Sequence, residues 1–180
     1  MEQEKIKELN TLALYLVKEL MKQNFEGLEQ ISVRDYTSED PSLGYSLGLS
    51  TRDLKTTITL YLYSGDTFPL TSEALKRHHL SGVGDVLSAN PDIDLQDGGA
   101  KIEYFLGTED MFGYLRTSLQ DEHVLISTFF FGLLIKVRAT SEKGCGDWQE
   151  IFLKELYQNL SDIFLKFNPN NPTASIEFLQ

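Results

Sequence analysis

Apolar positions recur along the chain with two different periods, and each period predicts a different kind of element. Near both ends of the chain the period is three to four residues, which is typical of amphipathic helices that bury one face. The sequence therefore predicts a first helix within residues 1–26 and a last helix over residues 146–167. The predicted buried stripes are Ile6, Leu9, Ala13, Leu16, Val17, Leu20 and Met21 in the first helix, and Trp148, Ile151, Phe152, Leu156, Leu160, Ile163 and Phe164 in the last.

Between these helices the period is mostly two residues, which predicts β-strands. The clearest strand is residues 57–63, where Ile58, Leu60 and Leu62 alternate with threonines and tyrosines. Because both of its faces carry large side chains, we expect this strand, which forms a hairpin with residues 45–49, to lie at the centre of a sheet. Residues 124–140 are long enough to form a second hairpin that turns at Phe131–Gly132. Further strands are expected within 28–36, 100–107 and 112–120, and a helix within 67–91 has weak points at Gly82 and Gly84.

The order of these elements predicts the fold class. Strands joined by hairpins, with helices between the runs of strands, are typical of α+β domains. We expect a central antiparallel sheet of about six or seven strands that is flanked by helices. The chain of 180 residues fits one domain, 1–180, with an N-terminal helix (1–26), a sheet-and-helix core (27–167) and a C-terminal tail (168–180).

Net charge narrows the range of partners. The formal charge of −11 counts against a nucleic-acid binder, which needs a basic surface to neutralise phosphates. The charge permits a basic protein as the partner, and a solvated acidic surface without such a partner is the other interpretation; the oligomeric state is left open. No apolar run is long enough to span a membrane. We expect a cytoplasmic protein if Met1 is the native start, and an exported one if an upstream leader was removed.

Residues with catalytic or metal-binding potential are few. His78 and His79 are adjacent, so on a helix they point in different directions and do not chelate one metal ion easily. Cys145 is the only cysteine, and the acidic residues near it oppose a thiolate. We therefore expect no catalytic residue, no metal site and no cofactor.

One pair of residues forms a candidate binding patch. Lys136 and Arg138 are two positions apart in a predicted strand, so their side chains point to the same face. They could form a basic spot that binds an anion or a partner, or simply a solvated or salt-bridged strand face. Carboxylates facing them inside a deep pocket would favour a ligand-binding protein or an enzyme. A flat apolar patch rimmed by acidic residues would favour a protein-binding module.

Two stretches resemble a poorly characterised group of bacterial proteins. "PSLGYSLGLSTRDLKTTITLYLYSGD" contains a Gly-Tyr pair followed by a Thr-x-Tyr-x-Tyr strand, and "STFFFGLLIKVRATSEKG" ends in a Lys-x-Arg-x-Thr strand. The group is similar in architecture to PsbP-like proteins, and this resemblance implies a central antiparallel sheet between helices, an α-β-α sandwich. Proteins of that fold are known mainly as binding and accessory proteins. The resemblance supplies no catalytic motif, and a shared fold does not confer a shared function.

These observations lead to one main expectation and two alternatives. The main expectation is a non-catalytic protein-binding or accessory domain, for example an immunity or adaptor protein. The first alternative is a small-ligand-binding protein or enzyme with a pocket between the sheet and a helix. The second is a structural protein of the cell envelope.

Overall fold

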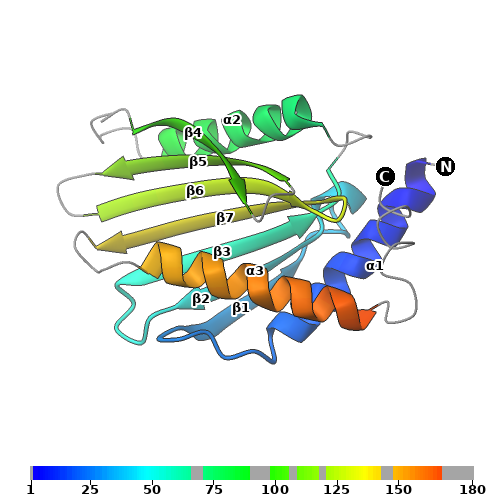
Figure 1. Cartoon of the computed structure of the whole chain (residues 1–180), viewed down its shortest axis with the longest axis horizontal. Coiled ribbons are helices and arrows are strands. Elements are labelled where there is room, and N and C mark those ends of the chain that lie inside the picture. The colour runs from blue at the N-terminus through cyan, green and yellow to red at the C-terminus, as the bar shows by residue number, and fades with distance from the viewer. Residues whose placement is uncertain are drawn as a thin grey trace.

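The computed structural model describes residues 2–65, 71–89, 98–105, 109–117, 121–142 and 148–167. Within these ranges the chain is an α+β protein with an antiparallel sheet and helices, which confirms the predicted class (Figure 1). The helices are α1 (Glu2–Leu20), the short 3-10 helix η1 (Pro41–Leu43), α2 (Ser72–Ala89) and α3 (Trp148–Phe167). The strands are β1 (Glu29–Asp35), β2 (Tyr45–Ser50), β3 (Thr56–Tyr63), β4 (Gly98–Phe105), β5 (Glu109–Thr117), β6 (Asp121–Phe130) and β7 (Leu133–Glu142).

The sheet has the strand order β1-β2-β3-β7-β6-β5-β4, and neighbouring strands are antiparallel. The predicted hairpin turn at Phe131–Gly132 joins β6 to β7, and both turn residues have positive φ angles. The central strand is therefore β7 and not β3. Strand β3 is the third of the seven described strands, with β2 on one side and β7 on the other, so its expected position at the centre was wrong by one strand. Alternation predicts which residues share a face but does not predict the order of the strands.

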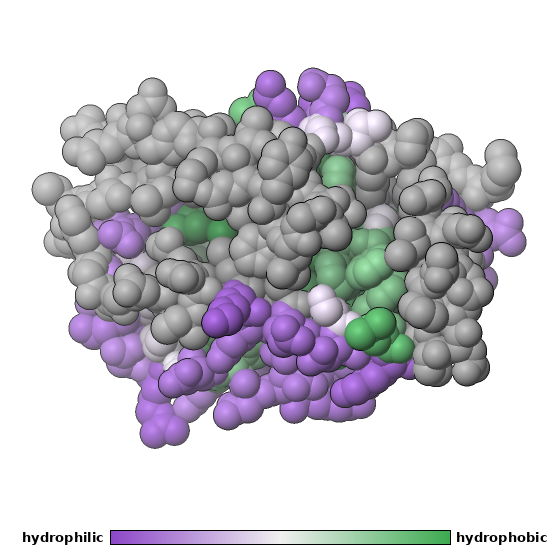
Figure 2. All heavy atoms as spheres, in the orientation of Figure 1, coloured by the Kyte–Doolittle hydropathy of each residue, from purple (hydrophilic) through white to green (hydrophobic). Residues whose placement is uncertain are grey.

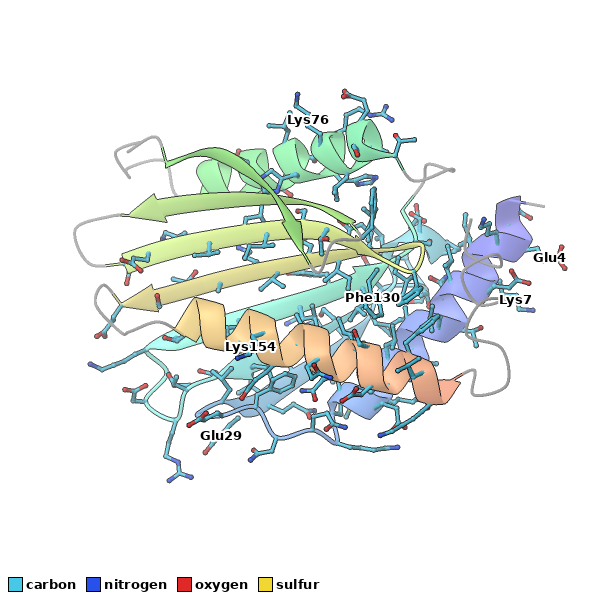
Figure 3. All side chains as sticks on the ribbon, in the orientation of Figure 1. Glu4, Lys7, Glu29, Lys76, Phe130 and Lys154 are labelled. Atoms are coloured by element: carbon cyan, nitrogen blue, oxygen red, sulfur yellow. The ribbon has the colours of Figure 1, made fainter. Side chains whose placement is uncertain are left out.

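One face of the sheet is covered by α1 and α3 (Figure 1). Ile58, Leu60 and Leu62 of β3 point to this side and pack in the main hydrophobic core. Figure 3 shows Phe130 between the sheet and α3, where its ring meets that of Phe164 edge-on at 6.0 Å between centroids. The predicted helix stripes are confirmed at most described positions, and the exceptions are Ile6, which is only partly buried, and Met21, which is 41% exposed. The buried stripe residues are Leu9, Ala13, Leu16, Val17, Leu20, Phe152, Leu156, Leu160, Ile163 and Phe164.

The opposite face carries α2, which packs mainly on β5 and β6. Leu75 of α2 lies in a small second cluster with Phe129 and Leu134. The helix continues through the glycines that predicted a weak point. A Cβ on Gly82 would lie 3.0 Å from Leu125 Cδ2, so this glycine lets the helix approach β6 closely. Helix α2 packs on one half of this face. The polar side chains of β2 and β3 lie on the other half.

Strand β1 forms one edge of the sheet, and all seven of its residues are exposed. Figure 2 shows hydrophilic residues gathered along the lower border of the molecule, where β1 and β2 lie in Figure 1. Two apolar side chains interrupt this edge, since Ile31 is 56% and Val33 is 40% exposed.

Some sequence-based predictions fall outside the described residues, namely those on Cys145 and the tail 168–180. In the part of the chain that the structure does describe, no helix combines the length and the apolar character that a membrane span requires.

Candidate functional site

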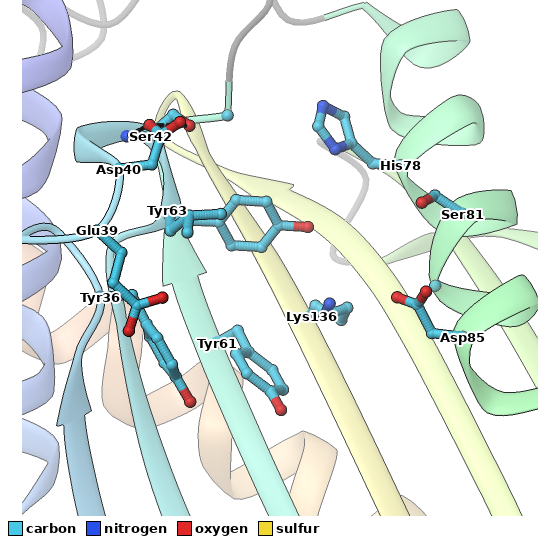
Figure 4. A pocket seen from close by; sticks show the side chains of 13 residues that line it. Tyr36, Glu39, Asp40, Ser42, Tyr61, Tyr63, His78, Ser81, Asp85 and Lys136 are labelled. Carbon is cyan, nitrogen blue, oxygen red and sulfur yellow. Dashed lines mark hydrogen bonds between the residues drawn. The ribbon is translucent and has the colours of Figure 1, made fainter. Parts of the chain in front are cut away.

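A pocket of about 610 Å³ lies between the polar face of the sheet and α2 (Figure 4). Its size falls within the range of small-molecule sites, roughly 300 to 1,000 Å³. The sheet contributes one side of the pocket, α2 the facing side, and the segment around η1 closes one end. The lining residues are Tyr36, Glu39, Asp40, Ser42, Leu43, Tyr61, Tyr63, Gly65, His78, Ser81, Gly82, Asp85 and Lys136.

Lys136, on the central strand, supplies the pocket's ammonium group. Its side chain is partly buried, and its Nζ lies 4.6 Å from the ring centroid of Tyr61 and 5.9 Å from that of Tyr63. Burial lowers the pKa of Lys136, the positive charge of Arg138 lowers it further, and the negative charge of Asp85 acts in the opposite direction. An ammonium over an aromatic face is stabilised by the ring electrons, so the tyrosines hold Lys136 in place.

Two tyrosines of β3 form the wall beside Lys136. Register explains their position, because Tyr61 pairs with Lys136 and Tyr63 pairs with Leu134 across β3 and β7. Burial raises the pKa of both phenols, strongly in Tyr63, which is mostly shielded from solvent. Their hydroxyl groups therefore keep their protons at neutral pH and are available as hydrogen-bond donors.

The facing wall is one side of α2, with His78, Ser81 and Asp85 at helical spacing. The ring of His78 meets that of Tyr63 edge-on at 6.0 Å between centroids. In Figure 4 the carboxylate of Asp85 points across the pocket toward Lys136. The helix thus places an acidic group opposite the ammonium of the sheet.

The end of the pocket is shaped by η1 and two glycines. Asp40 caps η1, because its Oδ1 accepts hydrogen bonds from the backbone N and the Oγ of Ser42, both at 2.8 Å. Gly44 follows with φ +63°, and a Cβ there would lie 2.1 Å from the carbonyl oxygen of Leu62. The backbone N of Gly65, which also has a positive φ, donates to the carbonyl of Ser42 at 3.2 Å. Only glycine fits these two positions without strain, so they fix η1 against the end of β3.

The structure places the two residues of the predicted basic patch differently. Lys136 and Arg138 do lie on the same face of β7, but only Lys136 lines the pocket. Arg138 lies two residues beyond Lys136 in β7, opposite Thr59 and Leu125 of the neighbouring strands. It influences the pocket through its charge, which acts on both Lys136 and Tyr61.

Sequence reasoning missed the acidic and aromatic partners of Lys136. Asp85 is far from Lys136 in the sequence, and only the packing of α2 brings the two together. One available signal was that Tyr61 and Tyr63 alternate on one face of a strand. Lys136 is likewise a polar residue between apolar residues in its own strand. If the two strands are assumed to be neighbours, their alternation places Lys136 on the same face as Tyr61 and Tyr63.

The two adjacent histidines take separate positions, as their helical geometry requires. His78 lines the pocket, whereas His79 is buried and its Nδ1 lies 3.0 Å from Ser127 Oγ. Burial lowers the pKa of His79 to about 4. Within the described ranges, no group of three or more potential ligands from histidine, cysteine, aspartate and glutamate is placed to hold a metal ion.

A second hollow of about 630 Å³ lies between α1 and η1 and shares Asp40 and Ser42 with the first. Asn10 bridges it, with Nδ2 donating to the carbonyl of Pro41 at 2.6 Å. Its basic residue, Lys7, is exposed, so this hollow offers no partly buried charge. The pocket beside α2 is therefore the stronger candidate for a functional site.

No protein-family model matches the chain, and no curated protein matches its sequence.

Proposed function

We propose that this protein binds a small polar molecule in the pocket between β3, β7 and α2. The observation that carries the proposal is the environment of Lys136: a partly buried ammonium group inside a pocket of about 610 Å³, with acidic side chains in the same lining. Among the alternatives that the sequence left open, carboxylates facing Lys136 inside a pocket favour ligand binding.

Three physical features support a binding role. The walls come from a helix and two interior strands, so the groups are held on rigid elements. The lining combines aromatic faces with a few convergent polar groups, as small-molecule sites do. A partly dehydrated ammonium group costs free energy in the empty protein, and an incoming ligand that pairs with it recovers part of that cost.

The proposal contains no catalytic step. Within the lining, the carboxylate of Asp40 accepts a hydrogen bond from the hydroxyl of Ser42, and this pair belongs to the cap of η1. We therefore propose that the protein is a ligand-binding protein rather than an enzyme.

A fragment screen by ligand-observed NMR tests this proposal. The library contains neutral, anionic, cationic and zwitterionic molecules, and each hit is repeated with the variant Ser81→Phe, whose larger side chain occupies the pocket. We expect hits that bind the original protein and are lost in this variant. The matched control is Lys76→Phe, which places the same side chain on the outer side of the same helix (Figure 3). Hits that are equally affected by both variants, or no hits, would contradict the proposal.

Protein binding is a second candidate function, and the exposed edge strand favours it. Ile31 and Val33 present apolar side chains on β1, an edge whose backbone groups can pair with an added strand. The acidic chain favours a basic partner. Affinity capture at low and moderate salt, with the original protein and with Val33→Lys, tests it. We expect one identified basic partner that is lost in the variant and weakened by salt. A partner list that the variant leaves unchanged would contradict this candidate.

The relationship to PsbP-like proteins is likewise a proposal. Its support is the resemblance of the two strand motifs, together with helices on both faces of an antiparallel sheet. A solved structure of a protein that carries the same two motifs would test it, since the relationship requires the same strand order.

A further inference from the structure

The pocket contains two opposite charges that face each other and do not meet. Asp85 is the acidic group whose charge acts on Lys136, and its carboxylate points toward the ammonium across the pocket (Figure 4). Yet the ion pairs in the described part of the chain join other residues, and none links Lys136 to Asp85. The stem of Lys136 reaches α2, since its Cδ would lie 3.7 Å from a Cβ on Gly82, so the ammonium group from the sheet and the carboxylate from the helix border the same pocket without forming an ion pair.

A ligand with a single charge would pair with only one of these two groups, the ammonium of Lys136 or the carboxylate of Asp85. An anion beside Lys136 would approach the carboxylate of Asp85, and Glu39 and Asp40 add further negative charge to the lining. A cation near Asp85 would approach the ammonium of Lys136. Like charges close together are unfavourable where water is partly excluded, so each simple ion meets a penalty.

From this arrangement we propose that the ligand is a small zwitterion of the α-amino acid class, whose carboxylate pairs with Lys136 and whose ammonium group pairs with Asp85. The inference rests on the proposed binding function and adds the ligand's chemistry. Its two charged groups are one carbon apart, and their opposite signs complement the two walls.

The depth of the two groups sets the orientation of the ligand. Lys136 is partly buried beside the tyrosines, whereas Asp85 is exposed to solvent. The carboxylate therefore enters first, and the ammonium group stays nearer solvent. The side chain of the amino acid then lies along Tyr61 and Tyr63, whose ring faces suit apolar or aromatic groups.

Isothermal titration calorimetry with the twenty standard L-amino acids, one at a time, tests the inference. The tightest binder is then compared with two analogues of the same side chain, the amine that lacks the carboxylate and the acid that lacks the amino group. We expect each analogue to bind at least about tenfold more weakly, because each loses one charged hydrogen bond. Lys136→Met should strongly weaken binding of the amino acid but hardly change binding of the amine analogue, which has no carboxylate. Asp85→Asn should strongly weaken binding of the amino acid but hardly change binding of the acid analogue, which has no amino group.

Several outcomes overturn the inference and leave the proposed function intact. If the acid analogue binds as tightly as the amino acid, the site is an anion site, and if the amine analogue does so, it is a cation site. If no amino acid binds while the fragment screen gives hits that Ser81→Phe removes, the pocket binds another class of molecule. If no amino acid binds and the fragment screen also gives no hit that Ser81→Phe removes, the proposed function fails as well.

Discussion

The two faces of β3 and β7 have opposite compositions and opposite tasks. On the side of α1 and α3, β3 presents Ile58, Leu60 and Leu62, all at most 1% exposed, in the main hydrophobic core. On the side of α2, the residues between them include Tyr61 and Tyr63, which line a pocket. The same backbone therefore serves packing on one face and carries the candidate site on the other.

This difference shows why the polar face can hold a site. A pocket beside a charged group lowers stability, since it removes packing contacts and leaves the ammonium partly dehydrated. The apolar face compensates with a continuous core that includes two helices. Substitutions on the apolar face should thus act mainly on stability, and substitutions on the polar face mainly on binding.

The largest effect is expected from truncating the core face. Leu60→Ala removes a side chain that is 0% exposed and leaves a cavity, so the free energy of unfolding should fall by about 4 kcal/mol. The control is Thr57→Ala, on the other face of the same strand, which is exposed and should cost less than about 1 kcal/mol. Urea denaturation followed by circular dichroism measures both. Equal losses would break the comparison between the two faces.

Acid should destabilise the protein through His79, in the part of the polar face that α2 covers. Burial lowers its pKa from 6.5 to about 4, so the unfolded chain gains a proton near pH 6.5 and the folded protein only near pH 4. The stabilisation is complete above pH 6.5 and is lost as the pH falls toward 4, by on the order of 3 kcal/mol.

Urea denaturation at several pH values between 4 and 7 measures this loss. His79→Gln keeps a polar partner for Ser127 but does not titrate in this range, so the difference between the two proteins isolates the histidine. A difference that does not vary with pH would show that His79 is accessible to protons in the folded state.

A smaller loss is expected at the glycine that connects η1 to β2. Gly44→Ala requires a positive φ and brings a Cβ against the carbonyl of Leu62, so it should cost about 2 kcal/mol. Gly27→Ala is the matched control, because Gly27 has φ +72° and no atom within 4 Å of an added Cβ. The difference between the two variants in chemical denaturation isolates the steric contact. If both cost the same, the approach of η1 to β3 is looser than the structure shows.

The sequence predicted the apolar face well, because burial leaves a periodic pattern. Leu9, Leu16, Leu60 and Phe152 were all expected to be buried from their spacing alone, and all are. The class of fold followed from the order of such segments. The position of β7 beside β3 did not, since strand order depends on which edges meet in space and not on the alternation within each strand.

The candidate site was predicted only in part, for a related reason. That Lys136 and Arg138 share a face follows from their spacing, but their different distances from α2 do not. The contribution of Asp85 required the packing of α2 on β6, which depends on Gly82 and leaves no periodic signal. Sites built from several elements at once lie beyond what the pattern of one segment encodes.

The smallest change in stability is expected at Lys136 itself, and it gives the sharpest test of the comparison. Lys136→Met keeps a long side chain against Tyr61 and removes a partly buried charge, so the loss of the cation-π contact is offset by the removal of its dehydration cost. We expect the free energy of unfolding to change by less than about 0.5 kcal/mol.

Binding of the amino acid probe should nevertheless weaken by about tenfold or more, since the variant loses the ammonium that pairs with the carboxylate. Val137→Ala, the next residue in the strand, points to the apolar face, is 2% exposed and should do the opposite, with a clear loss of stability and unchanged affinity. Thermal unfolding and calorimetric titration of both variants give the two quantities. If Lys136→Met instead destabilises the protein as much as Val137→Ala does, then Lys136 holds the fold together, and the division of tasks between the two faces of β7 is wrong.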